Sequence, residues 1–240
     1  MTTLARITLG LLLALFACSC GFDISFAEGK SGNGNIVEDR REVTEPFTEI
    51  QASEGIDVYV TQAEDFDITV EGDENIIDLI GTDIRKGELK IHAIENIGRA
   101  TKKVYVSLPS VTALRGSSGS SLASSEAIKG ERIDVDASSG ADLVLELYAD
   151  EIDLDSSSGA MVNLKGEANM LHVDSSSGSN VRASDLRTKR CNADASSGSN
   201  VHVNVTDDLT ADASSGANIR YSGEAAVHKN KSISGNISKD

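Results

Sequence analysis

Apolar and polar residues alternate with a period of two along most of the chain after residue 36. Clear examples are residues 133–136 (Ile-Asp-Val-Asp) and 141–145 (Ala-Asp-Leu-Val-Leu), which flank a Ser-Ser-Gly tripeptide. Such alternation predicts β-strands with one buried and one solvated face. Helical patterns are nearly absent, since only residues 75–80 would make a turn or two. The pattern therefore predicts an all-β protein.

The Ser-Ser-Gly tripeptide recurs at a nearly constant interval. Six copies are spaced by 21, 19, 19, 20 and 18 residues, and a degenerate seventh copy, residues 234–237, follows 19 residues later. The six glycines are Gly119, Gly140, Gly159, Gly178, Gly198 and Gly216. A unit of about 19 residues is too short for a helical repeat, but it matches one three-sided turn of a β-solenoid at about 3.3 Å per residue. We expect each glycine to form a corner that needs a positive φ.

Residues 36–115 also alternate, but without the regular interval. Residues 55–60 (Gly-Ile-Asp-Val-Tyr-Val) resemble the strand that follows each repeat glycine. We interpret residues 36–115 as the first, irregular coils of the same solenoid, with residues 73–90 projecting from it. A separate small β domain is the alternative. Residues 116–240 are expected to form the regular coils.

The first residues have the composition of an export signal. Arg6 precedes a mostly apolar run of about eleven residues, too short to span a bilayer but typical of a signal peptide. Residues 15–18 (Leu-Phe-Ala-Cys) are similar to a bacterial lipobox, so we expect residues 1–17 to be removed and Cys18 to carry lipid; Cys20 is a weaker alternative. Residues 18–35 would be a flexible tether. These features predict an outer membrane lipoprotein that faces the periplasm or the cell surface.

Composition narrows the classes of partner. The formal charge is −16, and aromatic residues make up only 4% of the chain. The acidity argues against nucleic acid, whose phosphates require Lys and Arg, and against docking on an anionic membrane surface. The scarcity of rings predicts a core of small and β-branched side chains, as a narrow stacked interior requires. Cys191 replaces an aliphatic residue of the repeat, so we expect a buried, inert thiol.

One slot of the repeat carries an aspartate in five successive units. The five are Asp136, Asp155, Asp174, Asp194 and Asp212. If equivalent residues stack at about 4.8 Å, these like charges repel one another. Hydrogen bonds from the Ser-Ser-Gly corners, raised pKa values or intervening cations such as Ca²⁺ would each relieve the repulsion. We favour the corner hydrogen bonds, because the repeat lacks the motif of calcium-binding β-helices, and we assign no metal ligand.

Catalytic residues are not indicated by the repeats. The serine-rich corners would need a base and an oxyanion site, no Gly-X-Ser-X-Gly motif is present, and His172 and His202 occupy polar strand slots that face solvent. Polysaccharide-active β-helix enzymes use carboxylates in a surface groove, but no unique pair stands out among repeated acids. We therefore expect no enzymatic activity and no cofactor.

Several stretches taken together resemble a known family. Residues 55–62 (GIDVYVTQ), 71–80 (EGDENIIDLI), 86–91 (KGELKI) and 102–109 (KKVYVSLP), followed by the serial Ser-Ser-Gly units, are similar to the DUF2807 family, named "putative auto-transporter adhesin, head GIN domain". The resemblance covers about residues 36–225. It implies a right-handed parallel β-helix, export by a Gram-negative bacterium of the Bacteroidota type and no established enzymatic activity. It supplies no catalytic residues.

Together these features predict a non-enzymatic envelope lipoprotein that offers a β-helix surface to glycan or protein ligands. The alternatives are a polysaccharide-active β-helix enzyme and a purely structural envelope protein. The expected partners are the membrane, through lipid on Cys18, and a glycan or protein ligand. Unpaired strand edges at the open end of a solenoid would also allow homo-oligomers.

Overall fold

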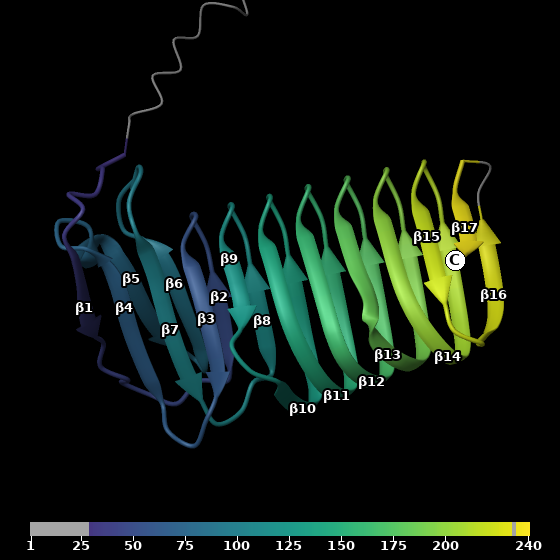
Figure 1. Ribbon diagram of the computed structural model, residues 1–240, viewed down its shortest axis with the longest axis horizontal. Coiled ribbons are helices and arrows are strands. Elements are labelled where there is room, and N and C mark those ends of the chain that lie inside the picture. Colours follow the sequence, from purple (N-terminus) through teal and green to yellow (C-terminus); the bar gives the residue numbers. More distant parts are fainter. Residues whose placement is uncertain (1–28, 232–233) are drawn as a thin grey trace, which may run out of the picture.

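The computed structural model describes residues 29–231 and 234–240, and within them nearly all regular structure is β (Figure 1). Residues 1–28, including the expected signal peptide, Cys18, Cys20 and part of the tether, lie outside the described residues. No helix among the described residues is long and apolar enough to cross a membrane. One 3₁₀ turn, η2 (Ile77–Leu79), interrupts the strands.

The strands of the described residues form one 17-stranded sheet. They are β1 (Ile36–Arg40), β2 (Glu49–Ala52), β3 (Asp57–Gln62), β4 (Asp67–Asp73), β5 (Ile80–Arg85), β6 (Glu88–Ala93), β7 (Lys102–Leu108), β8 (Ala113–Gly116), β9 (Ser121–Ser124), β10 (Ile128–Ala137), β11 (Asp142–Ser156), β12 (Met161–Ser175), β13 (Asn180–Ala195), β14 (Asn200–Ala213), β15 (Asn218–Ser222), β16 (Ala226–Lys231) and β17 (Asn236–Lys239).

The regular part is the expected parallel β-solenoid. Strands β10 to β14 pair in parallel with their sequence neighbours, so that each residue faces its equivalent in the next repeat. The solenoid has about seven turns, about 19 residues apart. Figure 1 shows the coils side by side along the long axis of the molecule, in the order of the sequence from β10 onward.

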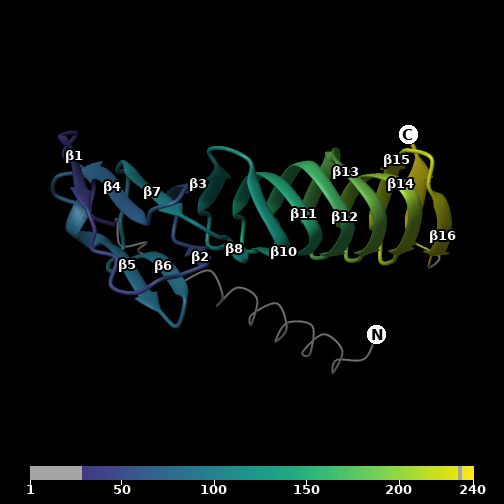
Figure 2. The same cartoon turned by 90° about the horizontal axis from the view of Figure 1, so that it is seen from below.

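Each coil has two flat faces rather than the three expected. In β11 the side chains of Leu143, Leu145 and Leu147 point inward, the alternation then shifts by one residue, and Ile152 and Leu154 point inward. The strand therefore curves around one edge of the solenoid without breaking, and the Ser-Ser-Gly turns close the opposite edge (Figures 1 and 2). The third, weakly alternating stretch of each repeat is this curved segment, which we call the bend.

Glycine and serine share the conformational demand of the tight turns. The second serine and the glycine both have positive φ, as in Ser158 (52°) and Gly159 (73°), and the N–H of Ala160 donates to the carbonyl of Ser157 at 3.0 Å. Two consecutive positive φ values define a type I′ turn. All six corner glycines have φ between 70° and 79°. The glycine N–H groups donate to serine carbonyls of the next coil, at 3.1 Å for Gly159 to Ser177, so the turns themselves form a ladder.

The interior is a continuous stack of mainly aliphatic side chains. One continuous cluster of buried Val, Ile, Leu and Ala runs through the coils, and Phe47 is the one buried phenylalanine among the described residues. A flattened coil leaves room for branched and small chains at native density but little room for rings. This accounts for the low aromatic content.

The N-terminal part continues the same sheet in a different spatial order. The β2–β3 arc lies between β6–β7 and β8–β9, since β2 pairs in parallel with both β6 and β8, and β3 pairs with both β7 and β9. The chain leaves this arc, forms β4 to β7 beyond it and then returns past it to β8. Strands β4 and β1 add to the sheet in antiparallel fashion, and β5 and β6 form an antiparallel hairpin.

Candidate functional site

The aspartates of the repeat lie in one column on one face of the solenoid. In parallel register, Asp136 lies opposite Asp155, Asp155 opposite Asp174, Asp174 opposite Asp194 and Asp194 opposite Asp212. These residues belong to the strand segments that precede the Ser-Ser-Gly turns. We call the outward surface of those segments the acidic face. Its second column, two residues earlier, runs through Asp134, Asp153, His172, Asn192 and Thr210.

An arginine closes the N-terminal end of the aspartate column. Arg115 of β8 donates from Nε to Asp136 Oδ2 at 2.9 Å, and from Nη1 to Glu49 Oε2 at 2.6 Å and to Glu88 Oε1 at 3.4 Å. The hydrogen bond to Glu49, and then the one to Asp136, raise the pKa of Arg115. The charge of Asp136 is therefore balanced within the fold.

The other four aspartates of the column have no such partner. Within the described residues, no hydrogen bond or ion pair reaches the carboxylates of Asp155, Asp174, Asp194 or Asp212. Partial burial, and then the neighbouring carboxylates, raise the pKa of Asp155 and of Asp194. The like charges are thus left to repel one another across the coils.

The expectation that the corners donate to these carboxylates is wrong. Two N–H groups of the turn are already used by the backbone: that of Ser157 donates to the carbonyl of Ala137 at 2.9 Å, and that of Gly159 donates to the carbonyl of Ser177. The hydrogen-bond ladder of the sheet continues through the turn, so these N–H groups donate to backbone carbonyls of neighbouring coils and not to the carboxylates. Of the three ways to relieve the repulsion, the structure shows raised pKa values at two positions of the column.

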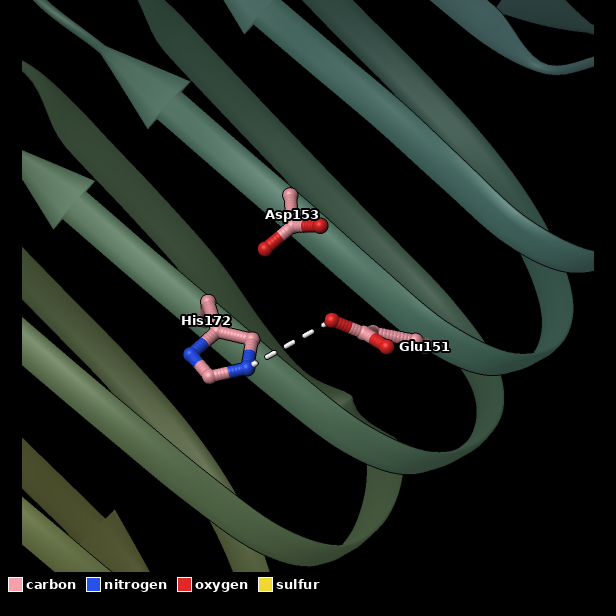
Figure 3. A group of neighbouring side chains, drawn as sticks. All are labelled: Glu151, Asp153 and His172. Carbon is pink, nitrogen blue, oxygen red and sulfur yellow. Dashed lines mark ion pairs between the residues drawn. The ribbon is translucent and has the colours of Figure 1, made fainter.

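One group on the acidic face has the composition of a metal site. Glu151, Asp153 and His172 each offer an atom within 4.8 Å of the others, and their side chains converge from β11 and β12 (Figure 3). His172 Nε2 lies 3.7 Å from Glu151 Oε1. However, Arg132 already contacts both acids, from Nη1 to Glu151 at 3.1 Å and from Nη2 to Asp153 at 2.5 Å. A cation would have to displace this guanidinium, so the group is satisfied as an ion-pair network.

The inward serines that follow the turn glycines serve the backbone. Where the residue after the turn glycine is serine, its buried hydroxyl donates to a carbonyl of an earlier coil: Ser120 to Ala52 at 3.0 Å and Ser199 to Ser175 at 2.8 Å. Such hydroxyls fill a polar slot at the edge of the core. They cross-link coils and are not placed to attack a substrate.

Cys191 lies in the aliphatic core, on the inward side of the strand segments that form the acidic face. It is opposite Leu171 and Leu209, and only 1% of it is exposed. Burial raises the pKa of its thiol to about 12. The thiolate that redox and nucleophilic chemistry require is therefore not formed at neutral pH.

A hollow of about 640 Å³ lies along the bend of the solenoid. Five successive strands, β10 to β14, contribute to it, and we call it the bend groove. It is lined by Gly130, Tyr148, Ala149, Asp150, Glu167, Ala168, Asn169, Arg187, Lys189, Thr206 and Asp207. Tyr148 is 39% exposed, and Asn169 Nδ2 donates to Asp150 Oδ1 at 2.6 Å beside it. The groove combines one aromatic surface with acids, amides and bases.

Sequence reasoning missed the bend groove. Its residues come from the weakest part of each repeat, where alternation fails, so no periodic pattern identified them. One residue could have indicated the groove. Tyr148 is one of only four tyrosines in the chain, and it lies at a position that the alternation does not assign to the core. Sequence reasoning placed His172 in a polar slot, and the structure places it in the acidic network described above.

Comparison with known proteins identifies the fold and a family model. The model described as "Putative auto-transporter adhesin, head GIN domain" (DUF2807) matches residues 46–225. A "putative adhesin" of Bacteroides fragilis superposes with a TM-score of 0.80 at 18% identity, covering 88% of this chain and 100% of that one. A "putative adhesin" of Parabacteroides merdae gives a TM-score of 0.73 at 18% identity, covering 89% and 99%.

A third similar structure has a different name. The "Putative lipid binding protein" of Parabacteroides distasonis gives a TM-score of 0.73 at 18% identity, covering 88% of this chain and 98% of that one. None of the curated proteins matches this chain. At these identities the structures establish a shared fold, and their names describe those proteins only.

Proposed function

This chain belongs to the DUF2807 family, and from that premise we propose that it is a non-enzymatic binding module of the cell envelope that engages glycan or protein ligands through the surface of its solenoid. The family and the similar structures carry the description of adhesins, which suggests a location at the envelope or surface. A rigid rod with side chains repeated at each coil suits extended, repetitive ligands.

The bend groove is the observation that carries the proposal. Its volume of about 640 Å³ is in the range of small-ligand sites, and a ligand would contact five coils at once. The half-exposed ring of Tyr148 offers an apolar surface on which a sugar ring can stack. The flanking Asp150, Asn169 and Arg187 supply acceptors and donors for hydroxyl groups. This combination favours a glycan.

The name of the third similar structure raises lipid binding as another function. A lipid site needs a sizeable apolar cavity, whereas the buried aliphatic chains here pack against one another in a continuous cluster. The bend groove is bordered by charged and amide side chains. We therefore favour a polar ligand over a lipid chain.

Repetition is the argument against catalysis. The aspartates of the column recur in five successive coils, and two further acids of the acidic face, Glu151 and Asp153, are engaged by Arg132. A polysaccharide-active enzyme would need one pair of carboxylates whose environments push their pKa values apart. Incubation with a panel of neutral and acidic polysaccharides, followed by reducing-sugar assay, tests this. Release of oligosaccharides would contradict the proposal.

Anchoring is the part of the proposal that rests on sequence alone. We propose that Cys18 carries the lipid and that residues 18–35 hold the solenoid away from the outer membrane. Labelling with a radioactive fatty acid should mark the wild-type protein and leave Cys18→Ser unlabelled. Protease treatment of intact cells then distinguishes an outward from a periplasmic orientation. Adhesion requires cleavage in intact cells.

Ligand binding is tested with a matched pair of variants from one strand. Tyr148→Ser removes the aromatic surface of the bend groove, and Val144→Ser, 45% exposed on β11 outside the groove, is its control. On an array of neutral glycans, the wild type and Val144→Ser should bind the same glycans, and Tyr148→Ser should bind them at least tenfold more weakly. No binding by the wild type, or equal binding by all three, would contradict the assignment. A purely structural envelope protein would give the first result.

A further inference from the structure

The face opposite the acidic face has a different chemistry. It consists of the outward side chains of the strand segments that follow the Ser-Ser-Gly turns. On β13, β14 and β15 one column is Asn180, Asn200 and Asn218, and the next is Arg182, His202 and Arg220. We call these six residues the arginine–asparagine face. They line a hollow of about 290 Å³ together with Val181, Ser184 and Val201.

The two arginines of this face have no carboxylate partner among the described residues. Within the described residues, the one hydrogen bond of Arg182 is to the sulfur of Met161, at 3.9 Å, and Arg220 makes no hydrogen bond or ion pair. On the acidic face, by contrast, Arg115 and Arg132 each bind three acids. Unpaired guanidinium groups in a protein with a formal charge of −16 mark a local positive site.

A carboxylate already occupies the middle of the site. His202 lies between the two arginines in the column, and its Nε2 contacts Oδ2 of Asp240. This contact shows that a carboxylate can lie against His202. It also means that Asp240 would compete with any anion that binds there.

The asparagines add neutral donors and acceptors beside the cations. Asn218 Nδ2 donates to Asn200 Oδ1 at 3.2 Å and to the carbonyl of Gly216 at 3.5 Å, so the amides of neighbouring coils form part of a ladder. Amides of this kind bind hydroxyl groups. The pairing of a cationic column with an amide column therefore matches a chain that carries both anionic groups and hydroxyls.

We propose that the arginine–asparagine face binds an anionic linear glycan, whose carboxylates or sulfates contact Arg182 and Arg220 and whose hydroxyls contact the asparagine column. Coils lie about 4.8 Å apart, so the backbone positions of Arg182 and Arg220, two coils apart, are separated by about 10 Å along the solenoid. A planar guanidinium binds a carboxylate or a sulfate in bidentate fashion. The site has two free arginines only, so nucleic acid, with its dense row of phosphates, fits it poorly. This proposal does not depend on the bend groove.

The test measures affinity for two probes by calorimetry at low and moderate salt. The probes are an oligogalacturonate, which carries carboxylates, and an oligosaccharide of chondroitin sulfate, which adds sulfates. Fully methyl-esterified oligogalacturonate is the neutral control. Each guanidinium removed, in Arg182→Gln or Arg220→Gln, should weaken binding at least tenfold. Asp240→Asn should strengthen binding severalfold. Arg190→Gln, an exposed arginine of β13 on the acidic face, should leave affinity unchanged.

The outcomes are distinct. Preference for one probe identifies the anionic group and supports the proposal, provided that the two arginine variants lose affinity and the esterified control does not bind. Absence of binding to both probes would overturn it. So would equal binding by wild type and both arginine variants, or equal binding of a single-stranded oligodeoxynucleotide. Thermal melting confirms that each variant is folded. Tyr148→Ser should retain full affinity here, which separates this proposal from the one for the bend groove.

Discussion

Neutralising the central aspartate of the column should stabilise the protein. Asp174 lies opposite Asp155 on one side and Asp194 on the other, and no hydrogen bond or ion pair within the described residues compensates its charge. The substitution Asp174→Asn keeps the shape of the side chain and removes both repulsions. An asparagine in this position can also hydrogen bond along the column, as Asn218 and Asn200 do on the opposite face.

The magnitude follows from the register. Two unit charges about 4.8 Å apart repel by about 1 kcal/mol in the dielectric of water, and physiological salt screens roughly half of this. Asp174 has two such neighbours. Its neutralisation should therefore raise the free energy of unfolding by about 2 kcal/mol at low salt and about 1 kcal/mol at physiological salt. For a chain of this size, that corresponds to roughly 2–8 °C in melting temperature.

The assay is thermal unfolding at pH 7 in about 0.02 M and 0.5 M salt. Asp136→Asn is the matched control, because Asp136 has one acidic neighbour in the column and an ion pair with Arg115 at 2.9 Å. In Asp136→Asn, loss of the attraction to Arg115 offsets loss of the repulsion from Asp155. The melting temperature of this variant should therefore change little or fall. The gain for Asp174→Asn should shrink at high salt.

Three results would refute the reasoning about the column. They are no gain for Asp174→Asn at low salt, a gain independent of salt, and an equal gain for Asp136→Asn. A loss of stability in Asp174→Asn together with release of bound calcium would show instead that a cation bridges the carboxylates.

Three further predictions concern the bend, the core and pH. Gly166→Ala should destabilise the fold by at least about 3 kcal/mol in denaturant unfolding. Gly166 has a φ of 115°, and a Cβ there would lie 2.1 Å from the carbonyl oxygen of Leu147. A Gly166→Ala variant as stable as the wild type would contradict the geometry of the bend. Cys191 should not react with a thiol reagent in the native protein and should react on unfolding, because its thiol pKa is about 12; rapid native labelling would show that the stack opens. The pKa values of Asp155 and Asp194 are raised in the folded state, so their contribution to stability is complete below the ordinary value of 3.8 and is lost as pH rises through the folded-state values. Asp155→Asn should therefore melt at a higher temperature than wild type at pH 7. This difference should shrink as pH falls and be absent at about pH 3.5.

The solenoid and its acidic column were predictable from the sequence, because a fixed repeat length imposes register. Once Ser-Ser-Gly units recur every 18–21 residues, equivalent aspartates must face one another, and the structure places Asp155 opposite Asp174. The stack of small aliphatic side chains was also predictable, because a short repeat has a narrow interior and the chain has few aromatic residues. Alternation also identified which residues of each straight segment point inward.

The number of faces and the N-terminal strand order were not predictable in the same way. Alternation with a period of two does not show where a strand curves. In β11 the bend corresponds only to a one-residue shift of the inward-facing positions between Leu147 and Ile152. The insertion of β2–β3 between β6–β7 and β8–β9 depends on pairings across more than 30 residues, which alternation leaves open. The corner hydrogen bonds were wrongly assigned because the backbone ladder through the turns was not anticipated.

The most direct measurement of the proposed function is attachment of cells to a ligand-coated surface. A deletion strain would be complemented with the wild type, with Tyr148→Ser or with its control Val144→Ser, each expressed at the same level. If the protein is a binding module that uses the bend groove, wild type and Val144→Ser restore attachment, and Tyr148→Ser leaves it at the level of the deletion strain. Attachment that is unchanged by the deletion would contradict a role in adhesion.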